Sequence, residues 1–153
     1  MTRCTTVAGL VLLFLLPSSS WAGISSVAKN SNLQFAKFVS LSSSGSVIVS
    51  AAGARSFSGG LVLLNGGTVT AASYTMTGSG NSNYTIILPA NNTVVISSGG
   101  HTLTLTNFTC SVPLTGKLGS GKTSMTFTVG ATATVTANAT PGAYSGTFNV
   151  TAN

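Results

Sequence analysis

Polar and apolar residues alternate along most of this chain with a period of two. Beyond residue 22, no apolar stripe keeps the 3.6-residue period of an amphipathic helix. A period of two places apolar side chains on one face of a strand and polar ones on the other. The pattern therefore predicts β-strands. The clearest candidates contain Val47 and Val49; Tyr84, Ile86 and Leu88; Leu103 and Leu105; and Met125, Phe127 and Val129.

Short stretches rich in Gly, Ser and Asn separate these candidate strands. Such residues supply the positive φ angles and side-chain hydrogen bonds that tight turns need. Many short strands with a turn signal about every ten residues are typical of an antiparallel β-sandwich of the immunoglobulin-like type. A small closed barrel is the alternative. The turn signals lie at residues 42–45, 58–60, 65–67, 78–82, 97–100, 119–121 and 140–142.

The first 22 residues have the features of a signal peptide. Arg3 precedes an apolar run over residues 7–16, and the small residues Ser20 and Ala22 fit cleavage before Gly23. The run is shorter than the roughly 20 apolar residues that a membrane helix needs. We therefore expect a signal helix over residues 1–22 and export to the periplasm, the cell surface or the medium. We expect no stable membrane span after cleavage.

The mature chain divides into two expected parts. Residues 23–32 are polar and alternate only weakly, which favours a flexible N-terminal arm. Residues 33–153 have the length of a single β-sandwich domain, with a first strand at 33–39. The last predicted strand, 144–150, must either complete a sheet or lie at an edge, because the chain stops three residues beyond it.

The charge balance is unusual because acidic side chains are absent. The chain has six Lys and Arg residues and no Asp or Glu. Its basic residues are well separated, whereas nucleic-acid binding needs clustered cations to displace counterions from phosphates. We therefore expect no nucleic-acid partner. A chain without carboxylate side chains is also expected to tolerate acid. The basic residues after residue 22 are Lys29, Lys37, Arg55, Lys117 and Lys122.

The missing carboxylates also limit the available chemistry. Glycoside hydrolysis needs a carboxylate pair, a catalytic triad needs an acid to orient its histidine, and hard cations need carboxylate oxygens. His101 and Cys110 remain, but nine residues apart in a regular strand they would lie on opposite faces. The phenylalanine and valine near Cys110 favour a buried thiol. We expect no enzyme, no cofactor, and no catalytic, cofactor-binding or metal-binding residues.

Residues 116–123, Gly-Lys-Leu-Gly-Ser-Gly-Lys-Thr, match the pattern of a phosphate-binding loop. That loop works by placing phosphate at a helix N-terminus, with a distant Asp helping to hold Mg²⁺. Here the following residues alternate like a strand and the chain has no Asp. We interpret the motif as a glycine-rich hairpin loop.

Several strand-and-turn phrases together resemble a bacterial family of exported proteins, the domain of unknown function 4402. The resemblance implies export and a β-rich fold. The family's layout is similar to that of chaperone–usher pilins and spore-coat-U-like subunits, in which an N-terminal arm completes a neighbour's sheet. It therefore implies a pilin-like sandwich. The phrases lie at residues 33–36, 53–56, 58–64, 66–69, 72–78, 84–89, 105–108, 129–132 and 142–150.

We therefore expect a non-catalytic secreted or cell-surface structural subunit. Its partners would be further copies or other surface subunits, joined through residues 23–32 or through the strand at 144–150 by β-strand addition. The alternative is a monomeric extracellular binding module or adhesin that recognises glycan or the cell envelope. For that function, Tyr74, Tyr84 and Tyr144 are the candidate sugar-binding platform.

Overall fold

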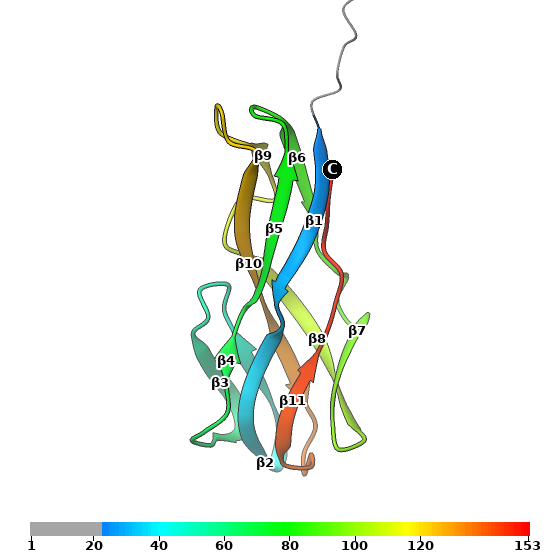
Figure 1. Ribbon diagram of the computed structural model, residues 1–153. Helices are drawn as coiled ribbons and strands as arrows, with labels where there is room; N and C mark the ends of the chain where they lie inside the picture. Colours follow the sequence, from blue (N-terminus) through cyan, green and yellow to red (C-terminus); the bar gives the residue numbers. More distant parts are fainter. Residues whose placement is uncertain (1–22) are drawn as a thin grey trace, which may run out of the picture.

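A computed structural model describes residues 23–153, and the expected signal peptide lies outside them. Within residues 23–153 the protein is all-β, with no helix, which confirms the predicted class (Figure 1). The segments around Val47, Tyr84, Leu103 and Phe127 are strands, as expected. The strands are β1 (Ile24–Ser31), β2 (Leu33–Val49), β3 (Arg55–Leu63), β4 (Val69–Thr70), β5 (Ala72–Gly78), β6 (Asn83–Ile87), β7 (Val94–Ser98), β8 (His101–Cys110), β9 (Thr115–Lys117), β10 (Ser124–Val135), β11 (Gly142–Gly146) and β12 (Thr151–Ala152).

The main sheet is antiparallel and closes on itself. Its strand order is β1-β5-β10-β8-β7-β11-β2-β3, and a further pairing joins β10 to β2. The strands β10, β8, β7, β11 and β2 therefore form a closed ring, in which each strand has a hydrogen-bonded neighbour on both sides. This barrel-like closure occupies the lower half of the molecule in Figure 1.

Strand β2 closes the ring by bending between two partners. Its first part pairs with β11, where Phe38 lies opposite Gly142, and its second part pairs with β10, where Val47 lies opposite Ala133. Between these parts, residues 41–44 form a bulge in the pairing with β3. Bulges bend a strand and increase its twist. The Ser-rich stretch that the sequence marks as a turn is thus a corner inside one long strand.

A buried serine fixes this corner. Ser40 is 8% exposed, and its Oγ donates a hydrogen bond of 2.7 Å to the carbonyl oxygen of Thr136. One residue further on, the Leu41 carbonyl accepts a hydrogen bond from the Asn138 amide. Both bonds tie the bend of β2 to the chain that leaves β10.

The upper half is built from two sheets that enclose the rest of the core. Strands β1 and β5 extend the main sheet alongside β10, and β12, β6 and β9 form a separate three-stranded sheet. Tyr74 and Met76 of β5 are buried, as are Tyr84 and Ile86 of β6. The ring of Tyr74 stacks on that of Phe127 at a centroid distance of 5.7 Å. Residue 23 and the C-terminus both lie at this upper end (Figure 1).

Strand β10 changes partners at Gly130. Its earlier residues pair with β5, where Val129 lies opposite Ala72, and its later residues pair with β2, where Ala131 lies opposite Val49. A Cβ atom at Gly130 would lie 2.3 Å from the Val49 carbonyl oxygen and 2.4 Å from the carbonyl carbon of Ser50. Glycine is needed here because the backbone at the end of β2 lies too close to β10 to leave room for a side chain.

We predict that Gly130→Ala lowers the free energy of unfolding by at least about 3 kcal/mol, because neither backbone can move without opening the ring. Urea denaturation of residues 23–153 measures the change. Gly23→Ala is the matched control, since nothing lies within 4 Å of a Cβ at that position. A Gly130→Ala protein as stable as the Gly23→Ala protein would contradict the steric account.

Candidate functional site

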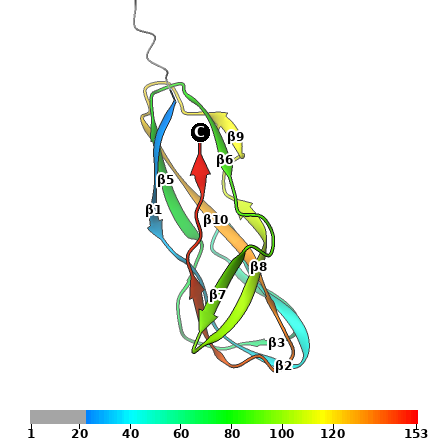
Figure 2. The ribbon, with the colours of Figure 1, turned by 90° about the vertical axis from the view of Figure 1, so that its right-hand side faces the viewer.

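The N-terminal segment 23–32, expected to be an arm, contains strand β1, which lies along β5. Val27 pairs with Met76, Ala28 with Thr75 and Lys29 with Tyr74. No strand of the described chain pairs with the other edge of β1. Figure 2 shows β1 beside β5 at the margin of the molecule. Half of the backbone hydrogen-bonding groups of β1 therefore point away from the sheet.

Few side chains anchor β1. Ile24 and Val27 are partly buried against the core, and no residue of the strand is fully buried. Its shorter side-chain hydrogen bonds are exposed: Ser25 Oγ donates to the Thr77 carbonyl (3.0 Å), and Asn30 Nδ2 donates to Thr75 Oγ1 (2.9 Å). A longer, part-buried bond joins Ser31 Oγ to the Ala71 carbonyl (3.4 Å). Exposed hydrogen bonds contribute little net stability because water replaces them. Only Asn32 separates β1 from Leu33, which is 1% exposed and begins β2.

The C-terminal chain differs from the predicted strand at 144–150. Strand β11 ends at Gly146, residues 147–150 belong to no strand, and β12 is a short strand on β6. Continuing the β12–β6 register would place Asn149 opposite Pro89, and proline has no amide hydrogen to donate. The Tyr74 hydroxyl instead donates to the Phe148 carbonyl at 2.9 Å. Figure 2 shows this chain in red, running up past β1.

Strand β11 is not an edge. It pairs with β2 on one side and with β7 on the other. Its Tyr144 is 1% exposed and stacks on Phe38 at 5.3 Å. Releasing β11 would open the ring, whereas releasing β1 would not.

His101 and Cys110 do not form a site. They are the first and last residues of β8, which puts them roughly 30 Å apart at about 3.3 Å per residue. The strand is not regular, because Asn107 (φ 49°) forms a bulge that shifts the alternation by one residue, so the argument for opposite faces does not apply. Leu105 before the bulge and Cys110 after it both pack on the core. The Cys110 thiol is partly buried and unbonded to another cysteine of the described residues.

The segment 116–123 has a different geometry from a phosphate-binding loop. It contains the end of β9 and a turn closed by the hydrogen bond from the Lys122 amide to the Gly119 carbonyl (3.0 Å), and β10 begins at Ser124. A strand therefore follows where a phosphate loop would have a helix N-terminus. The segment is not a hairpin either, because β9 pairs with β6. It carries the chain from the small sheet to the large one.

The three tyrosines do not form a platform. Tyr74, Tyr84 and Tyr144 are 3%, 5% and 1% exposed. Burial raises the pKa of Tyr74 to about 12 and raises that of Tyr144 above its usual value, because the ionised phenolate would lose its hydration. Both hydroxyls are hydrogen-bond donors inside the protein, Tyr74 to Phe148 and Tyr144 to Thr140. Their role is to hold strands together.

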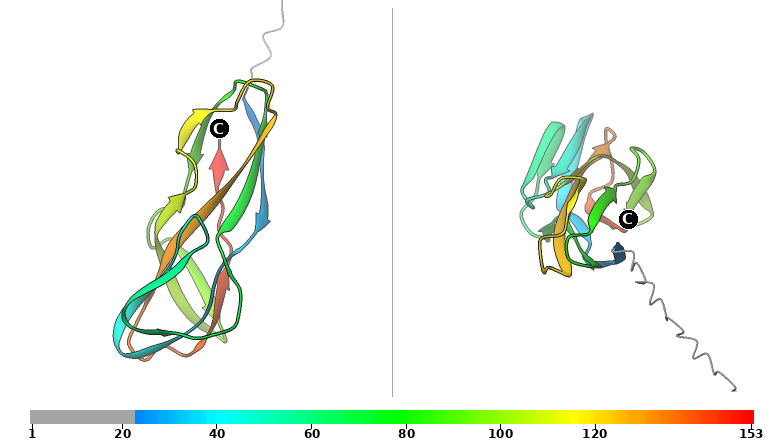
Figure 3. Two further views of the ribbon diagram at one scale, coloured as in Figure 1. Left: turned by 90° about the vertical axis from the view of Figure 1, so that its left-hand side faces the viewer. Right: turned by 90° about the horizontal axis from the view of Figure 1, so that it is seen from above.

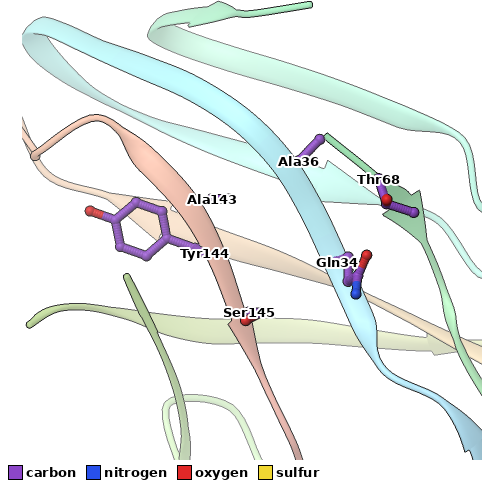
Figure 4. A pocket seen from close by; sticks show the side chains of 6 residues that line it. All are labelled: Gln34, Ala36, Thr68, Ala143, Tyr144 and Ser145. Carbon is purple, nitrogen blue, oxygen red and sulfur yellow. The ribbon is translucent and has the colours of Figure 1, made fainter. Parts of the chain in front are cut away.

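A hollow of about 240 Å³ lies between β2, β11 and the residues before β4 (Figure 4). Ala36 on its wall has a φ of 55°, in the left-handed region that residues other than glycine seldom adopt. In Figure 4 the ring of Tyr144 lies on the far side of β11 from Gln34 and Thr68. The hollow thus offers neutral polar groups. Its lining residues are Gln34, Ala36, Thr68, Ala143, Tyr144 and Ser145.

Residues 23–153 contain no group of three His, Cys, Asp or Glu side chains placed to hold a metal ion. None of their secondary-structure elements is a helix with the length and apolarity to cross a membrane.

The fold and these edges define an antiparallel all-β domain with open strand edges outside a closed ring. Residues 26–153 match the family model described as Domain of unknown function (DUF4402). The chain therefore belongs to that family, which confirms the resemblance seen in the sequence. Comparisons with curated proteins and with solved structures found no match.

We predict that stability changes little between about pH 6 and pH 3, because no side-chain carboxylate with a pKa near 4 is present to be protonated. Stability should instead fall at alkaline pH. The pKa of Tyr74 is about 12 in the folded protein and near 10 when unfolded. Its contribution is complete below pH 10 and is lost as the pH rises towards 12. Urea midpoints measured across this range test both statements.

Tyr74→Phe is the control for the alkaline loss. The variant lacks the ionisable hydroxyl, so its urea midpoint should fall less steeply above pH 10 than that of the parent, although it also loses the hydrogen bond to Phe148. A midpoint that collapses between pH 6 and pH 3 would contradict the acid prediction. An equal alkaline slope in both proteins would contradict the assignment to Tyr74.

Proposed function

We propose that this protein is a non-catalytic structural subunit, exported to the periplasm, the cell surface or the medium, that assembles by β-strand addition. The observation that carries the proposal is β1, a single edge strand with no fully buried side chain. The donor is β1 rather than the chain near the C-terminus, because β11 has neighbours on both sides. Further copies of the chain, or other surface subunits, are the partners.

The proposal includes a finer description of the fold, an immunoglobulin-like or pilin-like sandwich. It is supported by the two sheets that enclose the upper core, β1-β5-β10 on one side and β12-β6-β9 on the other. Met76 and Tyr84, one from each sheet, are buried between them. In this description β1 is the strand that completes the upper sheet.

Exchange of β1 replaces its contacts inside one copy by the same contacts between two copies. If β1 pivots at Asn32, it can lie on β5 of a neighbour, and its own β5 can accept β1 of a third copy. Each interface then joins two different surfaces, so the chain of subunits stays open-ended and a fibre can grow. The equilibrium depends on concentration, because the contacts themselves are the same.

Export and the absence of catalysis belong to the same proposal. Residues 1–22 have the sequence of a signal peptide, and the chain has no Asp or Glu. A structural role needs neither carboxylates nor a cofactor.

A pair of cysteines tests the exchange directly. Ala28 and Thr75 face each other across β1 and β5, at the 4.5–5.5 Å Cα separation typical of such pairs, which a disulfide spans. We predict that Ala28→Cys/Thr75→Cys in a Cys110→Ser background, oxidised at high dilution, stays monomeric. The same protein oxidised after concentration should give a ladder of disulfide-linked oligomers on a non-reducing gel. Reduction of the monomer that was locked at high dilution should restore its ability to assemble.

Two controls accompany this test: deletion of residues 23–32, and the variants that carry only one of the two introduced cysteines. A shortened chain keeps the ring but lacks the donor, so it should form no fibres by negative-stain electron microscopy. A free copy of the deleted peptide should not restore them, because it can occupy β5 but cannot link two chains. The single-cysteine variants can form at most dimers. A concentrated double-cysteine protein that gives only intramolecular disulfides would overturn strand exchange.

A monomeric binding module is the second candidate function. The neutral polar hollow beside Gln34, Thr68 and Ser145 supports it, since sugar hydroxyls are recognised by such groups. The buried tyrosines do not support it. A glycan array should then show saturable binding that Gln34→Ala abolishes, with Tyr84→Phe as the control. An array with no binding would remove this candidate.

A further inference from the structure

A second unpaired edge lies at the opposite end of the main sheet from β1. Strand β3 is the last strand in the order and pairs only with β2. Within residues 23–153 no strand pairs with its outer edge. Figures 1 and 3 place the β2–β3 pair at the outer margin of the molecule, at the lower end. The outward backbone groups of β3 are therefore free for another strand.

Large apolar side chains gather around this edge. Phe57 and Val62 of β3 are 49% and 44% exposed, Leu41 in the bulge of β2 is 49% exposed, and Leu64 directly after β3 is 36% exposed. Three further large hydrophobic residues of the described chain are exposed to this degree, on other parts of the surface. Exposed large apolar side chains along an unpaired strand favour association with another strand.

Lysine and proline, two usual protections of an edge strand, are missing from β3. Natural edges carry lysine or proline, or are covered by another element. Arg55 is the only charged residue of β3, and its guanidinium already donates to the carbonyls of Phe35 (3.1 Å), Lys37 (3.2 Å) and Leu64 (3.2 Å). At the centre of the strand, Gly59 has a φ of 73° and Gly60 lies against Ser43 in the bulge of β2. After Arg55 the strand has only uncharged side chains, and Phe57 and Val62 are its exposed large apolar ones.

We propose that the outer edge of β3 binds β3 of a second copy of this chain by antiparallel edge-to-edge pairing. An antiparallel strand can pair with itself about a two-fold axis, so that both copies use the same groups. The chain is positive overall, but β3 carries a single charge, that of Arg55, and its guanidinium bonds to carbonyls of β2 and of Leu64. The rest of β3 has no charge to repel a second copy or attract an acidic partner. This contact is separate from β1 and would join neighbouring subunits or fibres side by side.

The size of the edge sets the expected strength. A nine-residue strand is about 30 Å long, and one added strand pair buries less than the roughly 1,600 Å² of a standard protein interface. Self-association should therefore be weak, with a Kd on the order of 10 to 100 µM. Such affinity is sufficient where subunits are concentrated on a surface or within a fibre.

The test uses the Ala28→Cys/Thr75→Cys protein in the Cys110→Ser background, oxidised at high dilution, so that β1 cannot exchange. Sedimentation equilibrium over about 5 to 300 µM should show a monomer–dimer equilibrium. Phe57→Lys with Val62→Lys should raise the dimer Kd by at least about tenfold, because each copy would bring two lysines of like charge to the paired edge.

Val95→Lys is the matched control. Val95 is 53% exposed, but it lies on β7, which has neighbours on both sides. Its dimer Kd should stay within about twofold of the parent. Circular dichroism and urea midpoints verify that each variant is folded, and Val62→Lys alone replaces the double variant if that one is unstable.

The proposal would be overturned if the oxidised Ala28→Cys/Thr75→Cys protein stayed monomeric at the highest concentration. It would also be overturned if Val95→Lys raised the dimer Kd as much as the two lysines on β3. Failure of β1 exchange has a different signature, the absence of intermolecular disulfide ladders. The two proposals can therefore fail independently.

Discussion

The crossing of β2 over β10 is the constraint on which the rest of the structure depends. The ring closes because one strand, β2, pairs with β11 along its first part and with β10 along its second. The bulge at residues 41–44 makes this bend, and Gly130 lets the two backbones approach. The cooperative core follows from it, because Phe38, Val47 and Val49 face inward only if β2 turns at this point.

Closure also determines where the protein can interact. Every ring strand has two hydrogen-bonded neighbours, so none of them can be donated without breaking the core. Outside the ring, the two end strands of the main sheet, β1 and β3, each have one neighbour. The free edges thus lie at opposite ends of the sheet, where the two proposed contacts would not compete for the same surface.

The sequence predicts the strands well where alternation is strong and poorly where the strand bends. Phe127 and Val129, or Leu103 and Leu105, alternate with polar residues and are buried as expected. The bend of β2 could not be predicted, because its Ser-rich stretch has the composition of a turn and only tertiary pairing makes it a bulge. The same is true of Asn107, whose left-handed conformation reverses the alternation of β8. In β1 the apolar residues Ile24 and Val27 are three apart, so no period predicts the pairing with β5.

The open edges follow from the composition as much as from the topology. Most edge strands are protected by charged side chains, which oppose pairing because they would be buried or would face like charges. With no Asp or Glu and five Lys and Arg residues after residue 22, this chain has few charges to place on its edges. Lys29 is the only charged residue of β1, and Arg55 of β3 is held by three carbonyls. A composition that removes acid-sensitive carboxylates from the fold therefore also removes the usual barrier to edge pairing. The predicted tolerance of acid and the proposed association through strand edges therefore rest on one sequence property, the absence of Asp and Glu.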